Sequence, residues 1–232
     1  FQQMLASQNM PLIDLTDAHF VGCGISMVIH PRNPHAPTCH ANYRYFELQT
    51  SDQTFWWFGG GADLTPYILY EEDAQHFHET LKSACDAHTC ANYTDYKAWC
   101  DRYFYIPHRN EHRGIGGLFF DYLKDEHPDT LFPFIQSCAN AFIPAYQPIL
   151  EKRIHTPTHS DEHHWHQIRR GRYAEFNLVY DKGTLFGLKT KGRIESILMS
   201  LPPEVKWEYD IPTPPEHQAL IQVLKEPKDW IL

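Results

Sequence analysis

Two neighbouring segments with strand-like patterns most constrain the fold of this chain. In ANYRYFEL (residues 41–48), alternation places Asn42 and Arg44 on one face. Tyr43 and Tyr45 then lie on the other face. The aromatic run TFWWF (54–58) follows within the distance that a hairpin loop spans. We therefore expect the two segments to pair as antiparallel strands.

The rest of the first two thirds of the chain contains segments with strand patterns and segments with helix patterns. VGCGISMVI (21–29) reads as a strand that leads into the proline-rich loop HPRNPHAP, and GGLFFDYL (116–123) reads as a further strand. From Glu71 onward the pattern changes to that of a helix, with apolar residues at helical spacing. A second helix is expected from Thr94, whose hydroxyl is suited to cap it, to a point before Pro107. Residues 129–154 also have helical spacing, which Pro144 and Pro148 should kink or split.

The C-terminal third has the pattern of a strand meander followed by a helix. Residues 151–166 are polar and are expected to be solvated. YAEFNLVYD (173–181) alternates between apolar and polar residues, and Lys182 with Gly183 supplies a tight turn. TLFGL, RIESILMSL and VKWEYDI are expected to be three more strands, and HQALIQVLKEPKDWIL an amphipathic helix.

This order of elements is typical of an α+β domain with an antiparallel sheet. The chain has 232 residues, and it contains no linker rich in proline, glycine or serine. We therefore expect a single domain over residues 1–232. Hydrophobic residues make up 42% of the sequence, which is enough for a substantial core.

Charge and composition exclude several classes of partner and location. A formal net charge of -9 opposes binding to nucleic acid and to anionic membrane surfaces. No apolar run approaches membrane-spanning length, and the opening residues lack the pattern of a signal peptide. The six cysteines form no C-x-x-C pair, which favours free thiols in a reducing cytosol. Because the first residue is not Met, we expect that upstream residues have been lost.

Four of the sixteen histidines are candidate metal ligands. His30 ends one expected strand and His40 precedes the next, so the rigid connector can place both at one rim. His78 lies on an inward helix face, and His108 follows a proline. Neutral imidazoles bind several divalent metals. Sequence spacing alone fixes no geometry, so hydrogen-bonded structural histidines are the favoured interpretation from the residues themselves.

Other residues suggest an anionic ligand. Guanidinium groups bind carboxylates in a bidentate manner, although surface ion pairs are the safer interpretation for any single arginine. Asp181 is equally suited to act as a base or hydrogen-bond acceptor in a cavity and to serve the D-K-G turn. Glycines 59–61 permit either the close approach of a flat ligand or a bulged turn. The arginines that cluster are Arg109, Arg113, Arg169, Arg170, Arg172 and Arg193.

Motifs of several common enzyme classes are absent from the sequence. There is no G-x-S-x-G, Walker, Rossmann, zinc-finger or H-E-x-x-H pattern. Hydrolase, kinase, dinucleotide-binding and metalloprotease functions therefore lack support. From the residues alone, the chain is an anion-binding α+β domain with a possible metal site.

Four long blocks of the sequence stand out: GISMVIHPRNPHAPTCHANYRYF, WWFGGGADLTPY, YFYIPHRNEHRGIGGLFFD and RRGRYAEFNLVYDKGTLFGLKTKGRIESILMSLPP. Together they resemble the oxygen-dependent (aerobic) coproporphyrinogen III oxidase family, in its bacterial type without its N-terminal portion. The resemblance implies a large flat antiparallel sheet flanked by helices on both faces. It also implies a cytoplasmic enzyme of haem biosynthesis and a homodimer with its contact around residues 173–208.

The activity that the resemblance implies is the oxidative decarboxylation of two propionates of coproporphyrinogen III to vinyl groups. The product is protoporphyrinogen IX, with CO2 and H2O2. Molecular oxygen is the co-substrate, no organic cofactor takes part, and a divalent metal such as manganese is possible.

The resemblance also implies roles for individual residues. His40 corresponds to the proton donor and Asp181 to a catalytic acidic residue. Lys182 and Lys191 depart from the family pattern, so we expect altered substrate contacts without loss of function. The implied metal ligands are His30, His40, His78 and His108. The implied substrate contacts are Ser26, Asn42, Tyr43, Arg44, Lys191, Gly192 and Arg193.

Two other functions use the same features. A noncatalytic tetrapyrrole carrier would need the same arginines and aromatic residues. A metal-dependent oxygenase would use the four histidines as ligands.

Overall fold

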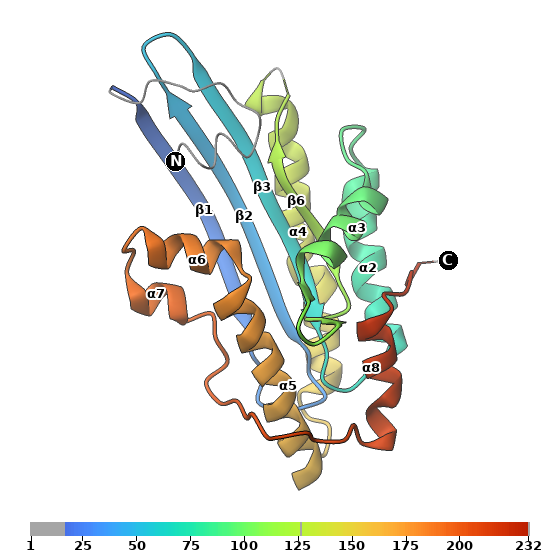
Figure 1. Cartoon of the computed structure of the whole chain (residues 1–232). Coiled ribbons are helices and arrows are strands. Elements are labelled where there is room, and N and C mark those ends of the chain that lie inside the picture. Colours follow the sequence, from blue (N-terminus) through green and yellow to red (C-terminus); the bar gives the residue numbers. More distant parts are fainter. Residues whose placement is uncertain (1–16, 126, 232) are drawn as a thin grey trace.

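An antiparallel sheet in the order β1-β2-β3-β6 organises the part of the chain that the structure describes (Figure 1). The computed structural model describes residues 17–125 and 127–231, so most of the opening segment searched for a signal peptide lies outside it. The strands are β1 (His19–Ile29), β2 (Thr38–Gln49), β3 (Thr54–Thr65) and β6 (Gly117–Leu123).

The β2–β3 hairpin is the one expected from the alternating segments. Its register pairs Gln49 with Thr54 at the loop and His40 with Asp63 at the far end. Strand β3 runs on through glycines 59–61, which therefore lie inside the sheet and form no separate turn. Without side chains, these glycines let the neighbouring strands β2 and β6 lie close to β3.

The expected helices of the middle region are present, with two local corrections. Helix α2 (Glu71–Asp86) buries the predicted inward stripe, which includes His78. Helix α3 (Tyr93–Tyr103) is capped by the side chain of Asn92 and not by Thr94. Helix α4 (Pro128–Arg153) contains Pro144 and Pro148 but is not split. Each proline removes one backbone hydrogen bond, and burial of the apolar stripe of α4 offsets that loss.

The C-terminal third is helical, so the predicted strand meander is wrong. YAEFNLVYD ends helix α5 (Ser160–Val179), and the next two segments form α6 (Lys182–Lys189) and α7 (Ile194–Leu198). VKWEYDI has no regular structure, whereas the final helix α8 (Gln218–Lys225) after η1 (Pro215–His217) was expected. The stretch 151–166 is not fully solvated, because Trp165 and His166 are buried. Trp165, Arg169, Tyr173 and Phe176 form one buried helical stripe, which the shorter alternating window conceals.

Helices cover both faces of the sheet, which confirms the α+β class. On one face, α2 and α4 enclose the main core, and Tyr43 of β2 points into it. On the other face, Phe119 packs with Phe104 and with Phe176 of α5. Figure 1 shows α5 and α6 on the side of the sheet opposite α4. The short hairpin β4 (Tyr105–Ile106) and β5 (Glu111–His112) lies between α3 and β6 in the chain.

Within the described ranges, no helix is both long enough and apolar enough to cross a membrane.

Candidate active site

Polar side chains from β2 form a row on one face of the sheet, which we call the site face. Because side chains alternate along a strand, His40, Asn42 and Arg44 share this face. Ser26 of β1 is paired with Asn42, so it lies on the same face. Tyr43 points the opposite way and donates a hydrogen bond from its hydroxyl to the Cys138 carbonyl in the core. Only the backbone of Tyr43 is therefore placed to meet a ligand on the site face.

His40 is held by a buried carboxylate. Its Nδ1 lies 2.7 Å from Asp63 Oδ1, and Arg113 donates to Asp63 Oδ2 at 2.7 Å. Burial raises the pKa of Asp63, but the charges of Arg113 and His40 outweigh it and hold the pKa below its usual value. Asp63 is therefore ionised and accepts the Nδ1 proton of His40. This arrangement leaves Nε2 of His40 to exchange a proton with a ligand.

Arg113 is an internal partner of this pair. Its guanidinium lies 4.0 Å from the Phe104 ring centroid and 4.3 Å from that of Tyr173, and it donates to Asn177 at 2.8 Å. Burial lowers the pKa of Arg113, but the negative charge of Asp63 raises it by more. The guanidinium group therefore remains charged. Arg113 thus balances the charge of Asp63 and does not reach a ligand.

Arg44 is the arginine of the site face. Its Nη2 atom lies 2.9 Å from Asp121 Oδ2, and its Nη1 atom donates to Asn42 Oδ1 at 2.7 Å. About a quarter of its side chain (23%) remains exposed. It is therefore both oriented by neighbours and accessible.

Most of the other clustered arginines have hydrogen-bond partners within the protein. Arg169 pairs with Glu111, and Arg170 donates to the Pro31 carbonyl. Glu175 accepts hydrogen bonds from both Arg109 and Arg172. The ion-pair interpretation is correct for Arg109, Arg169 and Arg172, and of these the Arg169–Glu111 pair is buried and not at the surface. The partner of Arg170 is a backbone carbonyl.

Asp181 is the N-cap of α6. Its Oδ2 accepts from the backbone N–H and the hydroxyl of Thr184, and its Oδ1 accepts from the Tyr103 hydroxyl at 3.0 Å. Tyr103 in turn stacks on Phe119 of β6 at 4.2 Å. The expected D-K-G turn is thus replaced by the start of α6, which Asp181 caps, and Tyr103 links the residue to the site face. Its role as a base stays a prediction.

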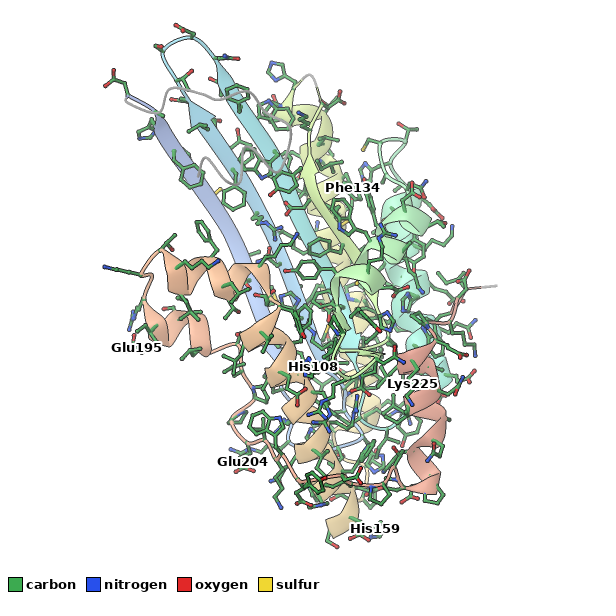
Figure 2. All side chains as sticks on the ribbon, viewed as in Figure 1. His108, Phe134, His159, Glu195, Glu204 and Lys225 are labelled. Atoms are coloured by element: carbon green, nitrogen blue, oxygen red, sulfur yellow. The ribbon has the colours of Figure 1, made fainter. Side chains whose placement is uncertain are left out.

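The segment of Lys191, Gly192 and Arg193 lies between α6 and α7 and is exposed. The Arg193 side chain is 80% exposed and lies 3.9 Å from Glu195, which Figure 2 shows on α7 at the outer side of the molecule. Within the described ranges, no hydrogen bond or ion pair connects this segment to His40, Asn42 or Arg44. Its contact with a substrate stays a prediction.

Comparisons with known proteins place this chain in a family. A family model described as coproporphyrinogen III oxidase matches residues 2–230. This chain belongs to the coproporphyrinogen III oxidase family. It is 52% identical over 233 residues to an oxygen-dependent coproporphyrinogen-III oxidase of Drosophila melanogaster, covering 99% of this chain and 60% of that protein.

Mammalian and plant relatives are similarly close to the chain. It is 54% identical over 217 residues to the mitochondrial enzyme of Homo sapiens, covering 91% of this chain and 48% of the relative. It is 53% identical over 219 residues to the chloroplastic enzyme of Hordeum vulgare, covering 91% of this chain and 56% of the relative. The chain thus spans about half to three fifths of these curated relatives.

The four histidines considered as metal ligands in this family member do not come together as a donor set. His30 contacts Thr38 and the Ser200 carbonyl through its two ring nitrogens. His78 contacts Tyr93 and the Ile115 carbonyl in the same way. Across residues 17–125 and 127–231, no group of three or more His, Cys, Asp or Glu side chains is arranged to hold a metal ion. The residues present do not fit the metal site.

His108, another of the four candidate histidines, also has a hydrogen-bond partner on each ring nitrogen. Its Nδ1 contacts the Tyr180 hydroxyl and its Nε2 contacts Glu175, both at less than 3 Å. Figure 2 shows His108 beside α5, the helix that carries Glu175. We derive no step through a metal.

Sequence reasoning missed Asp63, Asp121 and Tyr103 as parts of the site. A signal for Asp63 was available: counting outward from the hairpin loop pairs it with His40. Asp121 and Tyr103 reach the site face through tertiary packing.

A hollow of about 420 Å³ lies elsewhere in the protein. None of the expected site residues lines it. Its lining residues are Arg32, Asn33, Ile154, Thr158 and His163.

Proposed function

We propose that this chain provides the substrate-binding and proton-transfer face of an oxygen-dependent coproporphyrinogen III oxidase. The observation that carries the proposal is the His40–Asp63–Arg113 arrangement, which lies beside Arg44 on one sheet face. The curated relatives are named as enzymes with this activity. The substrate is coproporphyrinogen III, a macrocycle with four carboxylates.

Arg44 binds one substrate propionate in this proposal, and Asn42 and Ser26 supply neutral hydrogen bonds beside it. Arg193 and Lys191, which lie on the α6–α7 connection, bind another propionate. Charged hydrogen bonds contribute about 1.5–3 kcal/mol each, so a few of them orient the macrocycle firmly. The protein thus supplies orientation and electrostatics for the reaction.

The chemistry of each turn is a two-electron oxidation. One propionic acid group loses CO2, its carboxyl proton and a hydride from the carbon next to the ring, and a vinyl group remains. The two electrons and two protons reduce O2 to H2O2, so no organic redox cofactor is needed. Two turns give protoporphyrinogen IX.

His40 moves a proton at Nε2 in this scheme, because Asp63 fixes Nδ1 as the protonated nitrogen. Asp181 orients or deprotonates a pyrrole N–H. An Asp181→Ala variant that folds normally and retains full turnover would remove Asp181 from this scheme. In that case α6 capping is the whole role of Asp181.

The decisive experiment follows oxygen uptake and peroxide release when coproporphyrinogen III is added to the 232-residue chain. We expect one O2 consumed and one peroxide and one CO2 released per vinyl group formed. Binding of the macrocycle without oxygen uptake would instead identify a tetrapyrrole carrier.

We also propose that the chain forms a homodimer through residues 173–208. Large apolar side chains of α6, of α7 and of the residue that follows α7 are exposed, including Phe186 (52%), Ile194 (57%) and Met199 (76%). Such a patch is typical of a protein interface. We expect Ile194→Asp to produce monomers in sedimentation experiments. The control Ile143→Asp alters an equally exposed residue (57%) on α4 and should leave the dimer intact.

A cytoplasmic location is our further proposal. It is supported by the six cysteines, which are all free in the structure. The mammalian and plant relatives are named mitochondrial and chloroplastic. Cell fractionation of the native protein tests the proposal, and recovery in an organelle fraction would contradict it.

A further inference from the structure

An irregularity in the sheet lies directly beside Arg44. The pairing of β3 with β6 runs from Gly60 opposite Phe120 to Phe58 opposite Leu123, so Asp121 and Tyr122 together face Gly59. This extra residue is a β-bulge, and Tyr122 has a left-handed backbone with φ 52°. A bulky residue rarely adopts that conformation. Bulges with such strain are typical of places where a strand must redirect a side chain.

The side chain placed by this bulge is that of Asp121. Its Oδ2 lies 2.9 Å from the Arg44 guanidinium, while its Oδ1 accepts the backbone N–H of Tyr122 at 3.0 Å. The carboxylate is thus fixed to its own backbone on one side and to Arg44 on the other. Only 18% of the Asp121 side chain is exposed, so the ion pair is more shielded than an ordinary surface pair.

Gly59 makes room for this ion pair. A Cβ atom at this position would lie 2.5 Å from Asp121 Oδ1 and 2.7 Å from Arg44 Nε. Both distances are too short for unbonded atoms, so any side chain at position 59 would displace the pair. The first of the three sheet glycines is therefore required by the Arg44–Asp121 contact.

We propose that Asp121 is a positioning residue that, with Gly59, fixes the Arg44 guanidinium as the receptor for one carboxylate of the ligand. The inference rests on the proposed function, because it assigns Arg44 a substrate carboxylate. Asp121 and Asn42 each hold one terminal nitrogen of the guanidinium. A planar group that is held in this way loses little freedom when it binds a carboxylate.

The test is a double-mutant cycle on ligand affinity. The probe is coproporphyrin III, the stable oxidised form of the macrocycle, and its binding to the 232-residue chain is followed by fluorescence. We expect Asp121→Asn to weaken binding about tenfold, and Arg44→Gln to weaken it at least as much. In the double variant we expect the affinity of Arg44→Gln alone, because Asp121 acts only through Arg44. In turnover, Asp121→Asn should raise KM with little change in kcat.

Two further variants separate positioning from folding. Gly59→Ala should displace the guanidinium without altering any charge, and we expect it to weaken binding as Asp121→Asn does. Asp86→Asn removes the acid of the Lys82–Asp86 pair on α2 and should leave affinity unchanged. Thermal unfolding of each variant shows whether a loss of affinity comes from a loss of folded protein.

Each outcome bears on the inference. Unchanged or tighter binding by Asp121→Asn would overturn it, since tighter binding would show that Asp121 competes with the ligand. Independent, additive losses in the double variant would also overturn it. A wild-type chain that binds no such macrocycle would overturn the proposed function itself, whereas the results above leave that function intact.

Discussion

The Nδ1 atom of His40 lies 2.7 Å from Oδ1 of Asp63, across the β2–β3 pair. Asp63 is buried and paired with Arg113, so it orients the imidazole from inside the protein. A histidine held by a carboxylate in this way has a defined tautomer, and one ring nitrogen remains for proton transfer. This contact is therefore the first one to test.

Replacing Asp63 with Asn should impair turnover more than binding. The amide no longer fixes the His40 tautomer, so we expect kcat to fall by about 10²–10⁴, the usual contribution of a positioned acid or base. Removal of one partner from a buried ion pair also costs about 3–5 kcal/mol of stability. Steady-state kinetics and urea unfolding measure the two effects. Asp52→Asn on the exposed hairpin loop is the control. A stable variant with normal kcat would contradict the proposed role of His40.

Tyr43→Phe should affect the core and not the ligand. The variant loses the hydrogen bond to the Cys138 carbonyl, and we expect a loss of about 0.5–1.5 kcal/mol in the free energy of unfolding. Affinity for coproporphyrin III should not change, because the side chain lies on the face opposite Arg44. Weaker ligand binding at normal stability would show instead that the hydroxyl takes part in recognition.

The protein should lose stability in mild acid. Burial lowers the pKa of His30 to about 4 and the pKa values of His78 and His166 to about 3, all below the usual 6.5. The unfolded chain binds protons below pH 6.5 that the folded chain does not. Stability is therefore full above pH 6.5 and falls toward pH 4, by about 1.4 kcal/mol per pH unit for each such histidine.

Urea unfolding between pH 7 and pH 4.5 measures this slope. His166→Phe should make the slope shallower by the share of one histidine. His127→Gln, which alters an exposed residue, should leave it unchanged. A free energy of unfolding that does not vary over this range would refute the assignment of these histidines as buried and neutral.

Removal of metals should leave turnover unchanged. Both ring nitrogens of His30, His78 and His108 already have hydrogen-bond partners, so these side chains are not arranged as ligands. Dialysis against a strong chelator, followed by metal analysis and an assay of oxygen uptake, measures the effect. Loss of activity that returns with one particular metal would support the metal-dependent oxygenase instead.

The alternating pattern of residues 41–48 was enough to predict the hairpin and the two faces of its first strand. Alternation in residues 41–48 is a local property of the backbone, so it placed Asn42 and Arg44 together before any tertiary contact was considered. The helical stripe of α2, with His78 inward, was also predictable because its period extends over several turns. The family resemblance supplied His40 as a candidate, and the family itself is confirmed by the comparison.

The partners of these residues follow from how the helices and strands pack against one another. A short alternating segment is compatible with a strand and with the buried face of a helix. Residues 173–181 end helix α5, whose Tyr173 and Phe176 pack toward the sheet. Arg113 and Asp121 are distant in sequence from Asp63 and Arg44. The contact of Asp121 depends on the register of β6 and the bulge at Tyr122, and Arg113 is placed by the segment after β5, whose Ile115 N–H donates to the Leu64 carbonyl of β3. Ion pairs require distances of a few ångströms, and those distances are set by how the elements pack.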